Sequence, residues 1–163
     1  MSKTRKVVSN TTPIIALSEI GELDLLKKLY GMIFISESVL NEIKTEPAFS
    51  DVRANNSWIV VEKIEVNEEV RKMYKPKLHS GEVESMILAQ KLKADIIILD
   101  DYAARKTAQY LGLKVTGTLG VIIKAKQEGL ISEAKPLMEK LIENGLFISD
   151  NVLREVLSMT GEQ

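Results

Sequence analysis

The chain has 163 residues, 45% of them hydrophobic and 28% charged, which suits a single globular domain (1–163) with a sizeable core. It has no cysteine, which excludes disulfides, thiolate zinc sites and cysteine nucleophiles. Its net charge is −1, so nucleic-acid binding would require a local basic patch. The polar start and the lack of a long apolar run predict a soluble, cytoplasmic protein without a membrane partner.

Strands alternate with helices along the first part of the chain. Thr12 is expected to cap the first helix, with Pro13 at its first position. Strands are predicted over 6–9, 32–35 and 58–61, and helices over 13–20, 22–30 and 37–44, the last capped by Ser36. This alternation indicates βαβ units and a parallel sheet.

Residues 62–79 are the least regular part of the chain. The basic stretch 71–77 contains Tyr74, on which a base could stack. The alternative is a solvated surface connector. The longest helix is predicted over 80–92, with Glu82 on the same face as the apolar Met86 and Ala89, and with Glu84 nearer Lys91.

The apolar run 96–99 predicts a strand buried on both faces, and it ends at Asp100 and Asp101. The simplest interpretation of this acidic pair is that it caps the next helix and favours the positive end of its dipole. A further strand is predicted over 113–116, then helices over 121–128, 133–144 (capped by Ser132) and 150–159 (capped by Ser149 or Asp150), with 146–148 as a short strand or a linker.

Several polar residues share one kind of position, at a strand end or a helix start. They are Asn10, Glu42, Glu82, Asp100 and Asp101. In an open α/β sheet such positions can converge at one edge, where crowded carboxylates repel one another unless a cation compensates them. Oxygen-only ligands suit Mg²⁺ or Mn²⁺, and such a metal could activate water against a phosphodiester. Removing the charge of Glu82 or Asp100 is therefore expected to stabilise the metal-free fold.

The chain resembles the PIN-domain family, in particular a PIN-related prokaryotic subgroup. The resemblance rests on four segments in order, Val8–Pro13, Val39–Ile43, Gly81–Glu84 and Leu99–Asp101. It implies a three-layer α/β/α sandwich with a central parallel sheet of four or five strands. It also implies Mg²⁺- or Mn²⁺-dependent hydrolysis of single-stranded RNA, in many members as the toxin of a type II toxin–antitoxin pair. Expected partners are RNA, an antitoxin-like protein and a second copy of the chain.

The resemblance also implies roles for individual residues. Glu42, Glu82 and Asp100 match the acidic catalytic and metal-binding positions, and Asp101 could assist. Position 10 departs from the pattern, because most active members have aspartate where this chain has Asn10. An amide oxygen can coordinate a metal but adds no negative charge. Expected substrate contacts are Thr11, Thr12, Arg105 and Thr118.

Two other classes of function stay open at this point. The first is a PIN-like module that has lost catalysis and binds RNA or a protein, which Asn10 favours. The second is a phosphoacceptor domain, because paired aspartates at a strand end also occur in receiver-like folds. The late position of the Asp100–Asp101 strand argues against the second.

Overall fold

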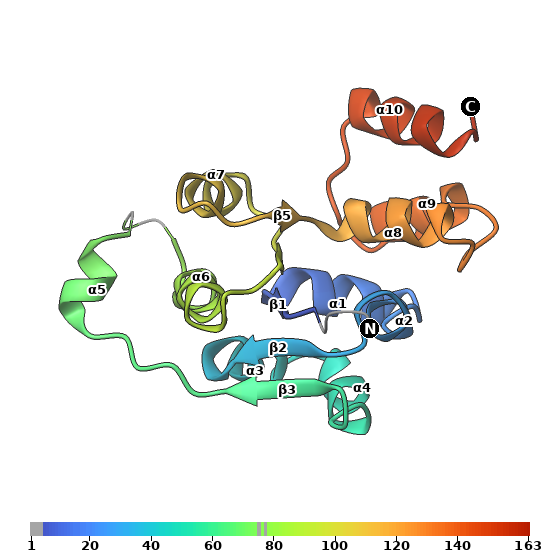
Figure 1. Ribbon diagram of the computed structural model, residues 1–163. Coiled ribbons are helices and arrows are strands. Elements are labelled where there is room, and N and C mark those ends of the chain that lie inside the picture. Colours follow the sequence, from blue (N-terminus) through green and yellow to red (C-terminus); the bar gives the residue numbers. More distant parts are fainter. Residues whose placement is uncertain (1–4, 75, 77) are drawn as a thin grey trace.

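A five-stranded parallel sheet organises the computed structural model, which describes residues 5–74, 76 and 78–163. The strand order is β3-β2-β1-β4-β5, and every neighbouring pair is parallel (Figure 1). The strands are β1 (Val7–Ser9), β2 (Ile33–Ser36), β3 (Ile59–Glu62), β4 (Ile96–Ile98) and β5 (Val115–Thr116). Because all are parallel, their carboxyl ends meet at one edge, the place where such sheets bind ligands.

Side chains of the central strands alternate between two separate cores. Val7 and Ile98 belong to one core cluster, whereas Val8, Ile97 and Leu99 belong to the other. This alternation is the period of two expected of a strand, and both faces are apolar because helices cover both. The buried central strand predicted over 96–99 is therefore confirmed.

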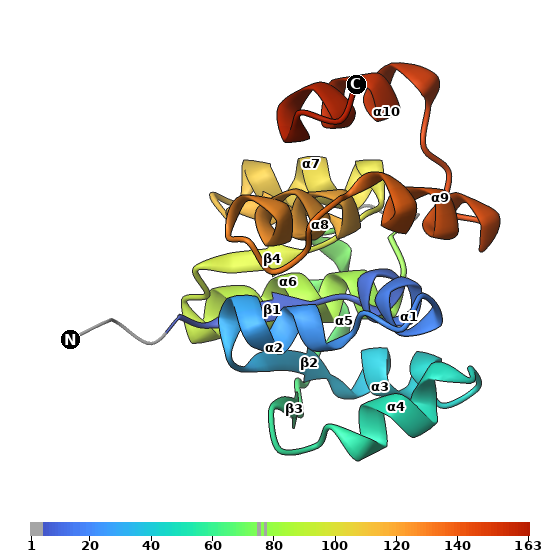
Figure 2. The same cartoon turned by 90° about the vertical axis from the view of Figure 1, so that its right-hand side faces the viewer.

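Ten helices surround the sheet in the described part of the chain. They are α1 (Thr11–Glu19), α2 (Asp24–Tyr30), α3 (Glu37–Ile43), α4 (Ala48–Ala54), α5 (Glu68–Lys72), α6 (Ser80–Leu92), α7 (Tyr102–Tyr110), α8 (Thr118–Gln127), α9 (Lys135–Glu143) and α10 (Asp150–Thr160). Buried residues of α1–α4 and α8–α10 join the first core, and those of α6 and α7 join the second. The predicted three-layer α/β/α sandwich is thus confirmed (Figures 1 and 2).

Four helix starts differ from the sequence predictions, and one of them is α2, which begins at Asp24, two residues later than predicted. The residue before α1 is Asn10, so Thr12 lies inside the helix and does not cap it. Helix α8 begins three residues earlier than predicted, at Thr118, and Ser132 does not cap α9, whose preceding residue is Ala134. Helix starts are hard to predict because several neighbouring Ser, Thr and Asn residues are equally good caps locally.

Other predicted caps are confirmed. Ser36 Oγ accepts from Val39 N at 3.2 Å at the start of α3, and Ser149 Oγ accepts from Val152 N at 3.2 Å at the start of α10. Residues 146–148 form a linker, not a strand. Helix α10 packs against α8 and lies at the top of both views (Figures 1 and 2). Among the described residues, no helix combines the length and the apolar character that a membrane crossing needs.

Candidate active site

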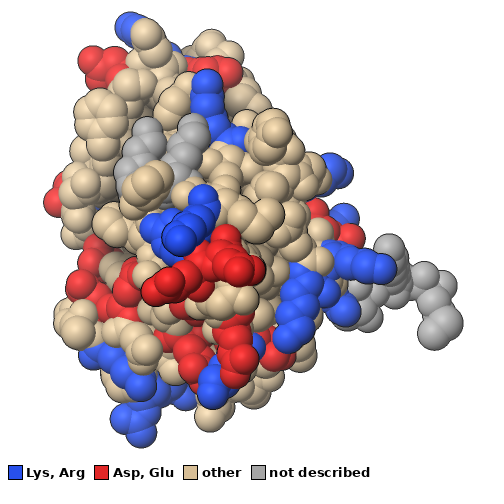
Figure 3. Space-filling model, turned by 90° about the vertical axis from the view of Figure 1, so that its left-hand side faces the viewer, with Lys and Arg blue, Asp and Glu red and all other residues tan. Residues whose placement is uncertain are grey.

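Figure 3 looks onto the side toward which the β2 and β3 arrows of Figure 1 point, which is the carboxyl edge of the sheet. Carboxylates gather in the middle of this side, with Lys and Arg side chains next to them. We call this region the acidic edge. Its residues come from the start of α1, from α3, from the start of α6, and from the turns that follow β4 and β5. Parallel topology therefore assembles residues that are far apart in the chain.

One half of the acidic edge is built around Gly81, in the first turn of α6, and we call it the Gly81 side. A Cβ atom placed on Gly81 would overlap Glu42 Oε1 and would lie 3.5 Å from Asn10 Oδ1. The lack of a side chain at this position thus lets the oxygens of Glu42 and Asn10 approach the same point. Glu42 is exposed on α3, whereas Asn10 is buried at the end of β1.

Asn10 is held in place from two directions. Its backbone N–H donates to Ile98 O at 2.9 Å, which ties the end of β1 to β4. Its side-chain Oδ1 accepts from Ser85 Oγ at 3.3 Å, and the same hydroxyl lies 2.7 Å from Gly81 O. Within the described residues, Asn10 Nδ2 donates no hydrogen bond. The amide is therefore oriented by its oxygen rather than by its N–H₂ group.

Glu82 is the buried carboxylate of the Gly81 side, with 6% of its surface exposed. Its Oε1 accepts from His79 N at 2.9 Å, an arrangement that closes the first turn of α6. Burial raises the pKa of Glu82, and the negative charges of Asp101 and Glu42 raise it further, whereas the hydrogen bond from His79 lowers it. The predicted apolar face is confirmed, because Met86 and Ala89 are fully buried.

The other half of the acidic edge follows β4 and β5, and we call it the Asp100 side. Asp100 Oδ1 accepts from Thr118 N at 2.8 Å, and Asp100 Oδ2 accepts from Thr118 Oγ1 at 2.6 Å. Asp101 is exposed, and its Oδ2 accepts from Ala104 N at 2.9 Å, so it caps α7 as the simplest interpretation predicted. A Cβ atom on Gly117 would lie 2.7 Å from both Arg105 Nη1 and Asp100 Oδ1.

An open pocket of about 480 Å³ lies on the Asp100 side. Its lining includes four residues predicted from the sequence, namely Thr12, Asp100, Asp101 and Arg105. Thr12 is exposed, whereas Thr11 is buried and its Oγ1 has no hydrogen-bond partner among the described residues. Thr118 is fully buried, and its hydroxyl donates a hydrogen bond to Asp100.

The two sides meet between Glu82 and Asp101, because the charge of Asp101 acts on the pKa of Glu82. Within the described residues, no Lys or Arg forms an ion pair with Glu42, Glu82, Asp100 or Asp101. These carboxylates are therefore not neutralised by ion pairs with Lys or Arg of the described residues, although hydrogen bonds from Thr118 reach Asp100 and the charge of His79 lowers the pKa of Glu82.

Sequence comparison agrees with this architecture. A family model for DUF3368, described as a PIN domain, matches residues 6–162. The chain belongs to the PIN-domain family. No curated protein matches it. PIN domains are generally nucleases, which places this one among the hydrolases at a coarse level, and they usually depend on divalent metals.

The oxygens of this PIN domain fit such a metal chemically but do not enclose one. Within the residues that the structure describes, no three Asp, Glu or His side chains form a group that could hold a metal ion by themselves. Glu42 Oε1 and Asn10 Oδ1, which approach each other beside Gly81, are oxygen donors, and the Thr11 hydroxyl is left without a partner among the described residues. Mg²⁺ is commonly bound in this way, by one or two carboxylates together with substrate phosphates.

Sequence reasoning missed several residues of the acidic edge. Ser85, which orients Asn10, is fully buried. In the sequence it could have been noticed as a hydroxyl residue on the apolar face of α6, three residues after Glu82. Glu84 was expected near Lys91, but its carboxylate accepts a hydrogen bond from Ser38 of α3 instead. The packing of α3 against α6 decides this contact, and a helical wheel of α6 alone does not contain it.

The basic stretch 71–77 lies partly outside the described residues, which exclude Lys75 and Lys77. Tyr74, the expected stacking residue, is half-buried against the second core, and its hydroxyl lies 3.4 Å from Gln90 Oε1. Two other aromatic residues, Tyr102 and Phe147, line the pocket on the Asp100 side and are far more exposed. They had no distinguishing signal in the sequence.

Proposed function

We propose that the chain is a metal-dependent endoribonuclease that hydrolyses single-stranded RNA at the acidic edge. The observation that carries this proposal is the buried Glu82 beside Asp101 and Glu42, which forms no ion pair with a Lys or Arg of the described residues and whose pKa stays raised although the charge of His79 lowers it. Burying a carboxylate next to other carboxylates costs stability, so a fold that keeps this arrangement is expected to use it. A divalent cation is the compensating charge that oxygen donors favour.

Residues of both sides would take part. Glu42 and Asn10 Oδ1, which approach one point, would bind Mg²⁺ or Mn²⁺ directly, and the charges of Glu82, Asp101 and Asp100 would favour the cation at this edge. When bound, the metal would supply an activated water and would stabilise the charge that develops on the phosphodiester. Because the carboxylates do not form a complete cage, we expect the RNA phosphate to contribute to metal binding.

Calorimetric titration of Mn²⁺ into the protein, with and without a short single-stranded RNA, tests this proposal. We expect weak binding to the protein alone and at least about tenfold tighter binding with RNA, which corresponds to about 1.4 kcal/mol. Gel analysis of the same RNA should show cleavage with Mn²⁺ and none with a chelator. Cleavage that resists the chelator would contradict the metal-dependent mechanism.

Gly81→Ala tests the geometry of the Gly81 side without removing any charge. The added methyl group would displace the flexible, exposed Glu42 carboxylate from its place beside Asn10. We expect reduced cleavage and an unchanged or slightly higher melting temperature, since alanine favours helix more than glycine does. Ser80→Ala, at the preceding exposed position of α6, is the matched control and should cleave like the parent.

A module that binds RNA without cleaving it is the second candidate, and Asn10 favours it. The Asn10 oxygen already accepts the Ser85 hydroxyl and brings no negative charge to the edge. RNA binding that needs no metal and leads to no cleavage would support this candidate. The narrower toxin role has its own test, in which induced expression arrests bacterial growth and Glu82→Gln abolishes the arrest.

A further inference from the structure

Two aromatic side chains stand exposed at the pocket on the Asp100 side. Tyr102, the first residue of α7, is 72% exposed, and Phe147, in the linker before α10, is 89% exposed. We call this space the Tyr102–Phe147 pocket. Large aromatic side chains normally gain stability by burial, so two exposed ones that line the same pocket indicate a ligand that covers them.

The Tyr102–Phe147 pocket combines apolar lining residues, such as Leu119 and Leu146, with polar and charged ones. Thr12, Asp100, Asp101 and Arg105 contribute to its lining. Arg105 is half-buried, and its guanidinium has no hydrogen bond or ion pair within the described residues. Planar rings beside an available guanidinium match a nucleotide, whose base stacks on aromatic faces and whose phosphate accepts from arginine. A protein-binding patch would instead need contiguous apolar surface at its centre.

We propose that the Tyr102–Phe147 pocket binds a base of the single-stranded RNA and thereby sets which phosphodiester reaches the acidic edge. The inference rests on the proposed function for its substrate class. Asp100 and Asp101 line the pocket and also belong to the acidic edge, so a base held there lies next to the proposed reaction site. The volume of about 480 Å³ falls within the range of small-ligand sites.

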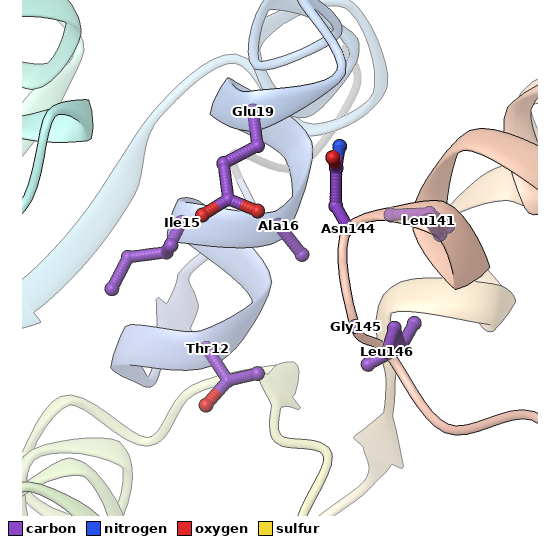
Figure 4. A pocket seen from close by; sticks show the side chains of 8 residues that line it. All are labelled: Thr12, Ile15, Ala16, Glu19, Leu141, Asn144, Gly145 and Leu146. Carbon is purple, nitrogen blue, oxygen red and sulfur yellow. The ribbon is translucent and has the colours of Figure 1, made fainter.

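A second groove indicates where the RNA backbone does not run. This groove, of about 210 Å³, lies between α1 and residues 141–146, and it shares Thr12 and Leu146 with the Tyr102–Phe147 pocket (Figure 4). Its charged lining residue is Glu19, and its described lining contains no Lys or Arg. The described lining of this groove offers a phosphate no cation, whereas Arg105 offers one in the Tyr102–Phe147 pocket, so we expect the backbone to pass on the Arg105 side of that pocket.

The test compares exposed residues that line the pocket with exposed residues that do not. Phe147→Ala and Tyr102→Ala are the test variants. Tyr110→Ala, on the same helix as Tyr102 and 90% exposed, and Met159→Ala, 57% exposed on α10, are the matched controls. All four side chains are exposed, so the variants should melt close to the parent, and Tyr102→Ala loses only a surface contact with Lys106, whose Nζ lies 5.0 Å from the Tyr102 ring centroid.

Affinity for a fluorescently labelled single-stranded RNA, measured by anisotropy, should fall about 5- to 150-fold for each test variant, the range that stacking of one base gives. The controls should stay within about twofold of the parent. An RNA with one abasic position, moved along the strand, adds a double-mutant cycle. At one position of the strand, the abasic site should lower the RNA affinity of the parent but should leave the RNA affinity of Phe147→Ala unchanged.

The outcomes separate this inference from the proposed function. If the parent cleaves RNA and both test variants bind and cleave like the controls, the base-binding inference fails and the nuclease proposal stands. If Phe147→Ala loses RNA binding but the parent never cleaves, the inference stands and the nuclease proposal fails. If Phe147→Ala keeps RNA affinity but loses self-association in sedimentation, the pocket is a protein interface and the inference is overturned.

Discussion

On the Gly81 side, the buried Glu82 receives one backbone hydrogen bond, from His79, and faces the charges of Glu42 and Asp101. On the Asp100 side, Asp100 receives both the N–H and the hydroxyl of Thr118. A carboxylate is therefore electrostatically unfavourable at one place on this edge and is compensated by two hydrogen-bond donors at the other. Charge removal should have opposite effects on stability at the two sites.

The largest expected effect is at Asp100. Asp100→Ala would leave the N–H and the hydroxyl of the fully buried Thr118 without an acceptor. We expect the free energy of unfolding in urea to fall by about 1–3 kcal/mol. Asp101→Ala, which removes an exposed cap of α7, should cost about 1 kcal/mol. If Asp100→Ala were as stable as the parent, the Thr118 contacts would not matter to the fold.

This expectation differs from the one drawn from the sequence, where charge removal at Asp100 was expected to stabilise the metal-free fold. The two donors of Thr118 are the reason for the change, because they already compensate the Asp100 charge. For Glu82 the earlier expectation stays a prediction.

Asn10→Asp should give the next largest effect, and it depends on metal. Without metal, the added charge beside Glu42 should lower the melting temperature. With Mn²⁺ the difference should narrow or reverse, since about 1.4 kcal/mol of stability accompanies each tenfold gain in affinity. Asn56→Asp, at an exposed position in the turn before β3, is the control, and its melting temperature should differ from that of the parent by the same amount with and without metal.

If Asn10→Asp changes the melting temperature by different amounts with and without Mn²⁺, position 10 belongs to the metal site. A loss of stability that is the same with and without Mn²⁺ would instead make Asn10 a structural residue. Because Asn10 Nδ2 donates no hydrogen bond within the described residues, the substitution itself should break none there, and the Ser85 hydroxyl can still donate to a carboxylate.

Glu82→Gln should stabilise the metal-free protein in a pH-dependent manner. The folded-state pKa of Glu82 lies above its ordinary value of 4.5, so the folded protein binds this proton more tightly than the unfolded chain does. Stability is therefore lost as the pH rises from 4.5 through the raised pKa. Glutamine can still accept from His79 N without carrying charge.

The measurement is the melting temperature of both proteins at about pH 4 and about pH 7. Glu82→Gln should melt above the parent at the higher pH and close to it at the lower pH. A gain of the same size at both values would mean that something other than the Glu82 charge is responsible.

Glu84→Gln should give the smallest effect and serves as the matched control for Glu82→Gln on the same helix. Its carboxylate accepts from Ser38, and a glutamine oxygen can accept the same hydrogen bond. We expect unfolding free energy within about 0.5 kcal/mol of the parent, and unchanged RNA cleavage. Loss of cleavage in this variant would indicate that the active site includes the contact between α3 and α6.

Local patterns in the sequence predicted the parallel sheet of this protein, and the resemblance to PIN domains implied its three layers. The apolar run 96–99 has to be buried on both faces, and alternating strands and helices leave a parallel sheet as the consistent solution. The same topology brings Asn10 and Asp100 to one edge, because parallel strands end together. These features depend on hydrophobic periodicity, which a single chain displays directly.

Only the tertiary structure decided how each carboxylate is compensated. That Asp100 faces Thr118, that Glu84 faces Ser38 and that Gly81 leaves room for Glu42 are contacts between elements far apart in the chain. The exposure of Tyr102 and Phe147 at one pocket is likewise invisible in the sequence. A hydrogen bond forms or fails over fractions of an ångström, and that precision comes from how helices pack on the sheet, which periodicity does not specify.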